Sequence, residues 1–274
     1  ERQVLHLASN DTTIIVSNLY REFIVDIPFY FHNNPELYIP LCALKKHTIE
    51  VEITLNNKER IVVHASDGQM TTPPENMYIE NFDLMTETIF IDTCDRMYIE
   101  KKKTDYIITQ LQTEIFDVDE NIQNAKFHLE FQNPVKELYF IIQRHGDDIH
   151  PFDYDNNLNF SNEEYILYEN LDHLTLDLDG EPILTKDTGT VLFLRPVQGT
   201  IHHSKTQLLR RFYSYSFAME PEKWYPTGQI NFSSIKEQIL NMKLTPSTRS
   251  RQVRVYALSY NILRVEDGLA RLLF

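Results

Sequence analysis

The stretch that decides the fold lies in the last third of the chain. It reads Phe212-Tyr-Ser-Tyr-Ser-Phe-Ala-Met-Glu220, followed by Trp224-Tyr-Pro-Thr-Gly-Gln-Ile-Asn-Phe-Ser233 and then by Val253-Arg-Val-Tyr-Ala-Leu-Ser-Tyr-Asn-Ile-Leu-Arg-Val265. Aromatic and β-branched residues of this kind fit the pleated, half-buried surface of a sheet. None of the three segments carries an arrangement of reactive side chains. They predict a β-protein that acts through its shape and not as a catalyst.

Segments elsewhere in the chain show the two-residue periodicity of strands. Ile49–Leu55 and Phe127–Phe131 alternate strictly between apolar and polar residues. Leu174–Gly180 alternates as well, and its final Asp-Gly is a hairpin-turn signal. Phe23–Phe31 and Val253–Val265 are apolar on nearly both faces, as in a strand buried inside a sandwich. Together these patterns predict many short antiparallel strands.

Helix signals are sparse. Asp95–Lys103 is predicted to be a short surface helix, with an acidic residue near its start and lysines at its end that complement the helix dipole. Ser234–Glu237 has the spacing of a capping box, which favours a helix through Met242. With twelve prolines at the joints, the pattern as a whole favours an all-β sandwich.

Composition sets further bounds. The 274 residues are 42% hydrophobic and 24% charged, which is ordinary for a globular protein, and they form one large or two medium domains. The sequence shows neither an apolar run of transmembrane length nor a signal peptide. Two cysteines, Cys42 and Cys94, cannot build a disulfide framework or a four-cysteine zinc site, so we expect a reducing compartment.

The net charge of −14 is spread unevenly. Residues 195–274 hold twelve Lys or Arg and five Asp or Glu, a net charge of +7, whereas residues 1–194 carry −21. One interpretation is two solvated surfaces of different composition. The other is that flanks of opposite sign on neighbouring subunits meet, which would make assembly sensitive to salt. The basic residues are scattered and accompany no recognised motif, which argues against direct contact with nucleic acid.

Five blocks of the sequence resemble the major capsid proteins of large nucleocytoplasmic DNA viruses. They are Ile27–Leu44, Phe131–Gln143, Tyr215–Glu222, Pro226–Ser233 and Val255–Arg264. The blocks follow the order of the family and span most of residues 21–274. Two departures are visible: nothing before about residue 20 matches the opening strands of the family, and the glycine-rich pattern at its C-terminus is reduced here to Gly268.

The resemblance implies an all-β protein of antiparallel jelly-roll sandwiches, a double jelly roll whose first member is incomplete in this chain. A polar segment at 116–124 breaks the apolar pattern, so we expect residues 1–118 to complete the first sandwich and 119–274 to form the second. The resemblance also favours a strand at 234–242, against the local helix signal. The chain is then either a fragment or a shortened relative.

Candidate chemical sites are weak. His202 and His203 are adjacent, and neighbouring residues on a strand point to opposite faces, so the pair does not suit one metal ion. The loop at Asp147–Asn157 offers oxygen ligands, but no second acidic cluster is placed to complete a cation site. Glu50 and Glu52 form a carboxylate pair typical of the wet face of a strand. Lys101–Lys103 is typical of a solvated helix end. We therefore predict no catalytic residues, metal or cofactor.

The best candidate for a contact site is the cluster Trp224, Tyr225 and Pro226. Amphipathic aromatic residues are enriched at the cores of protein interfaces. Alternatively, the loop folds back and caps its own sandwich.

The family resemblance implies a structural role. Three copies would form a pseudo-hexagonal capsomer, and capsomers together with minor capsid proteins would tile an icosahedral virion shell assembled in host cytoplasm. Within this class the chain is the major shell protein, a minor capsid paralogue or a scaffold. From another class, the rival is a carbohydrate- or receptor-binding β-sandwich, which the Asp147–Asn157 loop faintly suggests. An enzyme is the least favoured reading.

Overall fold

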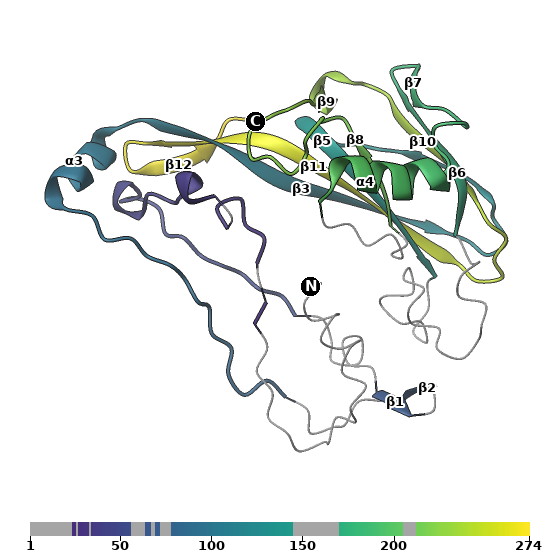
Figure 1. Ribbon diagram of the computed structural model, residues 1–274, viewed down its shortest axis with the longest axis horizontal. Coiled ribbons are helices and arrows are strands. Elements are labelled where there is room, and N and C mark those ends of the chain that lie inside the picture. The colour runs from purple at the N-terminus through teal and green to yellow at the C-terminus, as the bar shows by residue number, and fades with distance from the viewer. Residues whose placement is uncertain are drawn as a thin grey trace. The chain divides into compact units, whose positions relative to one another are not determined.

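The computed structural model of the chain (Figure 1) describes residues 24–25, 27–32, 34–55, 64–66, 69–71, 78–144, 170–204 and 212–274. Strands dominate these residues, and the helices among them are short. In chain order the elements are η1 Pro35–Leu37, η2 Leu41–Ala43, β1 His64–Ser66, β2 Gln69–Thr71, α3 Thr93–Lys101, β3 Thr104–Val118, β4 Asn124–His128, β5 Pro134–Arg144, β6 Leu171–Leu178, β7 Glu181–Leu184, η4 Phe193–Val197, α4 Gln198–His202, β8 Phe212–Ser216, β9 Ile230–Asn231, η5 Phe232–Ser234, β10 Gln238–Leu244, β11 Arg251–Glu266 and β12 Leu269–Leu272.

The chain divides into two compact units, Glu1–Ile39 and Pro40–Phe274. The described part of the first unit contains the single 3-10 turn η1, which Pro35 opens and in which Leu37 is buried. All the other elements belong to the second unit.

Two antiparallel sheets form the body of the second unit (Figure 1). One has the strand order β3-β11-β5-β8, with β12 extending alongside β11 and β9 beside β5. The other has the order β4-β10-β6-β7. Along the chain the eight main strands pass between the sheets in the sequence of a jelly roll, in which sequence neighbours often lie in opposite sheets. The all-β, antiparallel jelly-roll prediction is confirmed.

The core lies between these sheets. Side chains that face inward alternate with outward ones along each strand, as the pleat requires. The fully buried members from the first sheet include Val135, Leu138, Phe140, Val253, Val255 and Ala257, and those from the second include Leu174, Leu176, Leu184 and Leu240. A continuous apolar interior of this kind is what holds a sandwich together.

β3 is hydrogen-bonded to β11 over its whole length, from the pair Val118 and Arg251 to the pair Thr104 and Val265. The expected boundary at residue 118 assigns residues 104–118 to the first domain. In the structure residues 116–118 of the polar segment end β3 and residues 119–123 form the turn to β4, where Arg251 donates to the Ile122 carbonyl at 2.9 Å. β3 therefore shares a sheet with strands expected in the second domain.

Several local predictions are confirmed. Leu171–Leu178 and Glu181–Leu184 form a hairpin, and its two turn residues, Asp179 and Gly180, have φ of 50° and 84°. The surface helix exists as α3, and it starts earlier than expected because the Asp92 carboxylate accepts from the amides of Cys94 and Asp95, each at 2.9 Å. Gln238–Leu244 is a strand, as the family resemblance favoured over the capping-box signal.

Two predicted strands are not formed. Ile49–Leu55 and the described residues of Phe23–Phe31 contain no strand. A strand needs a neighbour to satisfy its backbone groups, and neither segment has one within the described part of the chain. The alternating pattern of Ile49–Leu55 therefore leaves its apolar side chains exposed.

Candidate interaction site at the aromatic loop

The segment between β8 and β9, residues 217–229, is named here the aromatic loop because it displays Trp224 and Tyr225. It begins where β8 ends, at Ser216. The Ser216 hydroxyl donates to the Ala218 carbonyl at 2.8 Å, and the amides of Phe217 and Ala218 both donate to the Lys136 carbonyl, at 2.9 and 3.2 Å. The start of the loop is thus bonded to β5.

The base of the loop is closed by contacts between its two ends. The Thr227 hydroxyl accepts from the Glu220 amide at 3.0 Å and donates to the Glu220 carbonyl at 3.1 Å. Gly228 follows with φ of 153°, and a Cβ at this position would lie 2.5 Å from the Phe217 carbonyl oxygen. Only glycine allows the two backbone segments to approach this closely.

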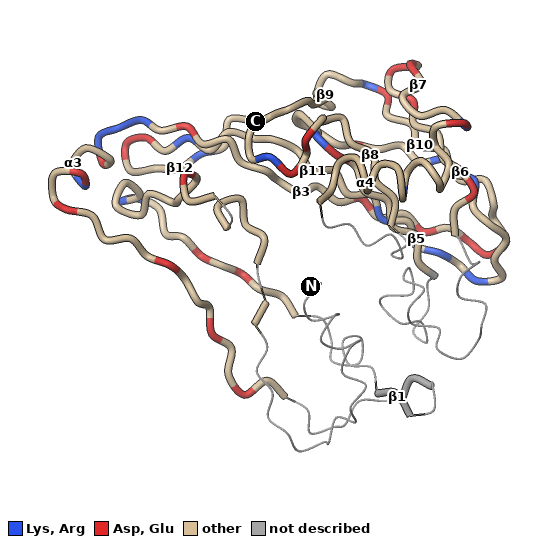
Figure 2. The backbone as a smooth tube through the Cα atoms, viewed as in Figure 1, with Lys and Arg blue, Asp and Glu red and all other residues tan. Residues whose placement is uncertain are grey.

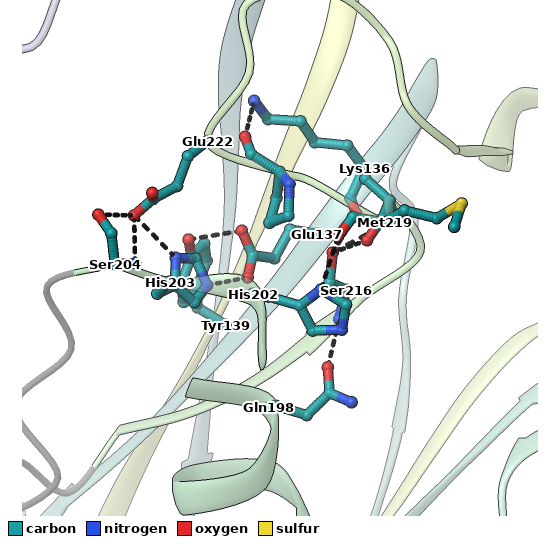
Figure 3. A network of polar contacts seen from close by, with 12 residues as sticks. Lys136, Glu137, Tyr139, Gln198, His202, His203, Ser204, Ser216, Met219 and Glu222 are labelled. Carbon is teal, nitrogen blue, oxygen red and sulfur yellow. Dashed lines mark hydrogen bonds and ion pairs between the residues drawn. The ribbon is translucent and has the colours of Figure 1, made fainter. Parts of the chain in front are cut away.

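Lys136 supports the loop from beneath (Figure 3). Its side chain is almost completely buried, its ammonium donates to the Pro221 carbonyl at 2.8 Å, and it lies 5.3 Å from the centroid of the Tyr260 ring. Burial lowers the pKa of Lys136, and the neighbouring Glu137 carboxylate opposes that shift. A buried ammonium that bonds a loop carbonyl holds the loop in one position.

Glu137 is the most buried acidic residue of the site, with 1% of its surface exposed. One carboxylate oxygen lies 2.6 Å from His203 Nε2, and the other accepts from the Tyr139 hydroxyl at 2.7 Å (Figure 3). The other ring nitrogen of His203 lies 3.9 Å from Glu222 on the aromatic loop. The imidazole therefore stands between a buried carboxylate on β5 and an exposed one on the loop.

The end of α4 fastens the outer side of the loop (Figure 3). His202 Nδ1 lies 3.1 Å from the Met219 carbonyl oxygen, and both the amide and the hydroxyl of Ser204 donate to Glu222, at 2.9 and 3.1 Å. Gln198 on the same helix accepts from the Ser216 amide at 3.1 Å. The loop is thus attached to β5, to α4 and to itself.

The predicted contact residues lie at the exposed tip of this supported loop. Trp224 and Tyr225 are 38% and 42% exposed, their rings meet edge to face with centroids 5.5 Å apart, and Pro226 is exposed beside them. Rigid, solvent-facing aromatic side chains lose little conformational entropy when a partner covers them. The contact role of the three residues stays a prediction.

The other sequence candidates lie apart. His202 and His203 are at the end of a helix instead of on a strand, and they bond different partners. Within the described residues, no three His, Cys, Asp or Glu side chains gather in a way that could hold a metal ion. Glu50 and Glu52 are exposed, the Lys101–Lys103 run ends α3 and begins the approach to β3, and Asp147–Asn157 lies outside the described residues.

Sequence reasoning missed Lys136 and Glu137 as the supports of the loop. A signal was present, since two adjacent charged residues interrupt an otherwise apolar strand within the block Phe131–Gln143. Charged side chains that are buried nearly always have partners. The partner of Glu137, His203, is 66 positions away in the sequence, and that of Lys136, Pro221, is 85 positions away. Local sequence patterns do not predict contacts between residues so far apart.

Comparison with known proteins agrees with the fold. The family described as "Large eukaryotic DNA virus major capsid protein" matches residues 95–271, and "Major capsid protein N-terminus" matches residues 2–94. The second match begins well before residue 20, so the expectation that nothing there corresponds to the family is wrong. No helix in the described residues has the length and apolar character needed to cross a membrane.

Two curated relatives are major capsid proteins. The protein of Pyramimonas orientalis virus is 28% identical across 91% of this chain, and that of Phaeocystis pouchetii virus is 25% identical across 91%. The chain spans 60% and 64% of the lengths of these two relatives. Among solved structures, a subunit of the quasi-atomic model of the PBCV-1 virus capsid matches 98% of this chain and 75% of its own, with a TM-score of 0.70 at 19% identity. This structural likeness shows a common fold.

Proposed function

The chain belongs to the family of large eukaryotic DNA virus major capsid proteins, and from that premise we propose that it is a structural subunit of an icosahedral virion shell. In this proposal three copies associate into a pseudo-hexagonal capsomer. Capsomers then bind one another and minor capsid proteins in the host cytoplasm.

The observation that supports the proposal is that the family match and the strands of the jelly roll cover nearly the same residues. The family match covers residues 95–271, and the eight main strands of the jelly roll run from Thr104 to Glu266. We therefore propose that the second sandwich of the double jelly roll starts before β3, and that the residues ahead of it belong to the first. This moves the expected boundary at residue 118 toward the N-terminus.

A shell subunit works through the area and shape of its contacts, so the proposal assigns no catalytic residue, cofactor or nucleic-acid contact to this chain. What it requires is a rigid body whose exposed loops keep their shape. The aromatic loop meets this requirement, because Lys136, His202 and Ser204 attach it to the sandwich. We propose that Trp224, Tyr225 and Pro226 contact a neighbouring subunit.

Mass measurement by light scattering over a range of concentrations tests the shell function. We expect a trimer, and we expect salt to weaken it if the basic C-terminal third meets acidic flanks of a neighbour. A well-folded monomer at every concentration would contradict self-assembly. Selective binding of that monomer to a glycan array would favour the carbohydrate-binding alternative. A trimer that is absent from purified virions would favour a scaffold.

The contact role of the loop has its own test. Trp224→Ala and Tyr225→Ala both alter exposed side chains, so we expect each variant to remain folded and to associate at least about tenfold more weakly, as at an interface hot spot. Leu192→Ala, which truncates another exposed apolar residue outside the loop, serves as a control. Unchanged association of both loop variants would leave the loop as a cap of its own sandwich.

A further inference from the structure

His203 directly follows α4, and its ring connects three parts of the fold (Figure 3). Nε2 lies 2.6 Å from a carboxylate oxygen of Glu137 on β5, and Nδ1 lies 3.9 Å from a carboxylate oxygen of Glu222 on the aromatic loop. The side chains of His203 and Glu137 are 15% and 1% exposed, whereas that of Glu222 is 47% exposed. A titratable ring therefore lies between a buried carboxylate and one that faces solvent.

Glu137 accepts a hydrogen bond on each of its oxygens. One bond comes from the Tyr139 hydroxyl at 2.7 Å, and the other joins the carboxylate to His203 Nε2 at 2.6 Å. Two donors suit an ionised carboxylate, and the short contact with Nε2 places the hydrogen of the ring on that nitrogen. Burial raises the pKa of Tyr260 on β11, which interacts with Glu137, so this phenol stays neutral where histidine titrates.

Protonation of the His203 ring changes the nitrogen that faces the aromatic loop. In the neutral ring with its hydrogen on Nε2, Nδ1 has a lone pair, and this lone pair repels the Glu222 carboxylate. In the imidazolium Nδ1 becomes a donor, and the ring carries a positive charge beside both carboxylates. The protonated ring therefore attracts the loop, whereas the neutral ring does not.

The other elements around the ring supply contacts of a different kind. β8 and α4 contain neither Lys, Arg, Asp nor Glu, and both are tan throughout in Figure 2. The ammonium of Lys136 and Nδ1 of His202 bond backbone carbonyls of the aromatic loop, and Nδ1 of a histidine can carry a hydrogen in the neutral as well as the charged ring. The loop itself adds Glu220 and Lys223, whose backbone groups share a hydrogen bond of 3.1 Å. The bonds from α4 and β5 to the loop backbone thus do not need a charged imidazole.

We propose that His203 is a pH-dependent clamp of the aromatic loop: the protonated ring bridges Glu137 and Glu222 and holds the loop, and loss of the proton loosens it. Histidine exchanges its proton between about pH 5 and 8. The stability that the bridge contributes is present below the titration of the ring and is lost as pH rises through it.

The clamp bears on assembly because Trp224 and Tyr225 follow Glu222 closely in the loop. The contact surface that these aromatic residues are proposed to form would be held more firmly in mildly acid solution. This consequence rests on the proposed function, whereas the clamp itself does not require copies of the chain to associate.

Amide hydrogen–deuterium exchange on the full chain tests the clamp. The Ser204 amide donates to Glu222 at 2.9 Å and the Glu220 amide donates to Thr227 at 3.0 Å, so both report whether the loop is attached. Each amide is given a protection factor, which is the exchange rate of an unstructured peptide at the same pH divided by the rate in the protein. A partly exposed ion pair changes the ratio of attached to detached loop about twofold to fivefold. We expect the protection factors to fall by that ratio between about pH 5.5 and about pH 8.

Two substitutions remove the bridge, and a third is the control. Glu222→Gln and His203→Gln each replace a group that carries charge by a neutral amide, so protection of the loop should no longer change with pH. His173→Gln removes a histidine that lies 3.5 Å from Asp172 on β6, outside the loop, and should keep the pH dependence of the unaltered chain. An equal pH dependence in Glu222→Gln and the unaltered chain would overturn the inference, as would protection that rises with pH.

Light scattering at the same two pH values separates this test from that of the shell function. Tighter association at the lower pH in the unaltered chain, but not in Glu222→Gln, would support both. A trimer whose loop protection does not change with pH would reject the clamp and leave the shell function standing. A monomer whose loop protection still falls as pH rises would reject the shell function and support the clamp.

Discussion

Residues 49–55 and 253–257 both carry an apolar side chain at every second position, but only the second segment lies in a strand. β11 has β3 on one side and β5 on the other, and its Val253, Val255 and Ala257 are fully buried. The apolar residues of 49–55 remain at least 39% exposed. Alternation therefore specifies which face of a segment is able to be buried, whereas neighbours decide whether a strand forms.

The largest expected effect comes from placing a charge at equivalent positions of β11 and of residues 49–55. Val255→Asp would place an unpaired carboxylate between the sheets, and we expect a loss of more than about 4 kcal/mol of unfolding free energy, enough to prevent folding. Val51→Asp changes an exposed residue, so the unfolding free energy of an isolated chain should change by less than about 0.5 kcal/mol. Urea unfolding followed by circular dichroism measures both. Similar losses would mean that 49–55 is already buried within one chain.

A second prediction compares two arginines on β11. Arg251 is fully buried and donates to the carbonyls of Thr245 at 2.7 Å and Ile122 at 2.9 Å, whereas Arg254 is half-buried and bonds Gln252. Arg251→Met should lose about 3 kcal/mol, because buried carbonyls lose charged donors. Arg254→Met should lose less than about 1 kcal/mol of unfolding free energy, because water can bond the Gln252 side chain in place of the guanidinium. Urea unfolding followed by circular dichroism measures both variants. Equal losses would show that the hydrogen bonds from Arg251 to the carbonyls of Thr245 and Ile122 add no stability.

These comparisons show which parts of the structure could be predicted from the sequence. The predicted strands cover most of β6 and β11, whereas the predicted strand Phe127–Phe131 shares only Phe127 and His128 with β4. The fate of 49–55 could not be read, since pairing depends on segments distant in sequence. The supports of the aromatic loop escaped for the same reason: Lys136 and Pro221 meet only after β5 and β8 pair. The contact role of Trp224 and Tyr225 was predicted from their residue types alone, and it stays a prediction.

A third prediction compares two glycines with positive φ. Gly228→Ala would bring a Cβ to 2.5 Å from the Phe217 carbonyl oxygen, so we expect a loss of about 2–3 kcal/mol and a displaced loop. Gly180→Ala has open space around it and should lose about 1 kcal/mol from its backbone conformation alone. Trp224 is the single tryptophan of the chain, so its fluorescence reports the aromatic loop directly. A spectral change in Gly180→Ala, or none in Gly228→Ala, would contradict this account.

The smallest effects concern two acids on β3 whose pKa values move in opposite directions. Burial raises the pKa of Glu114 against the opposing hydrogen bond from the Glu130 amide, whereas hydrogen bonds from Arg264 lower the pKa of Asp105. Between its unfolded pKa and its higher folded pKa, Glu114 holds more protons in the folded state, so its contribution to stability falls as pH rises. Asp105 contributes stability above its unfolded pKa, and that contribution is lost as pH falls through its folded pKa.

Replacing each carboxylate by its neutral amide should therefore change the melting temperature in opposite directions. At neutral pH Glu114→Gln should raise the melting temperature slightly, and Asp105→Asn should lower it, because the first removes an unfavourable charge and the second a paired one. Both differences should narrow toward acid pH, that of Glu114 at the higher pH because its folded pKa is the higher of the two. Melting curves at a series of pH values measure this. If both substitutions changed the melting temperature in the same direction, the opposite pKa shifts of Glu114 and Asp105 would be contradicted.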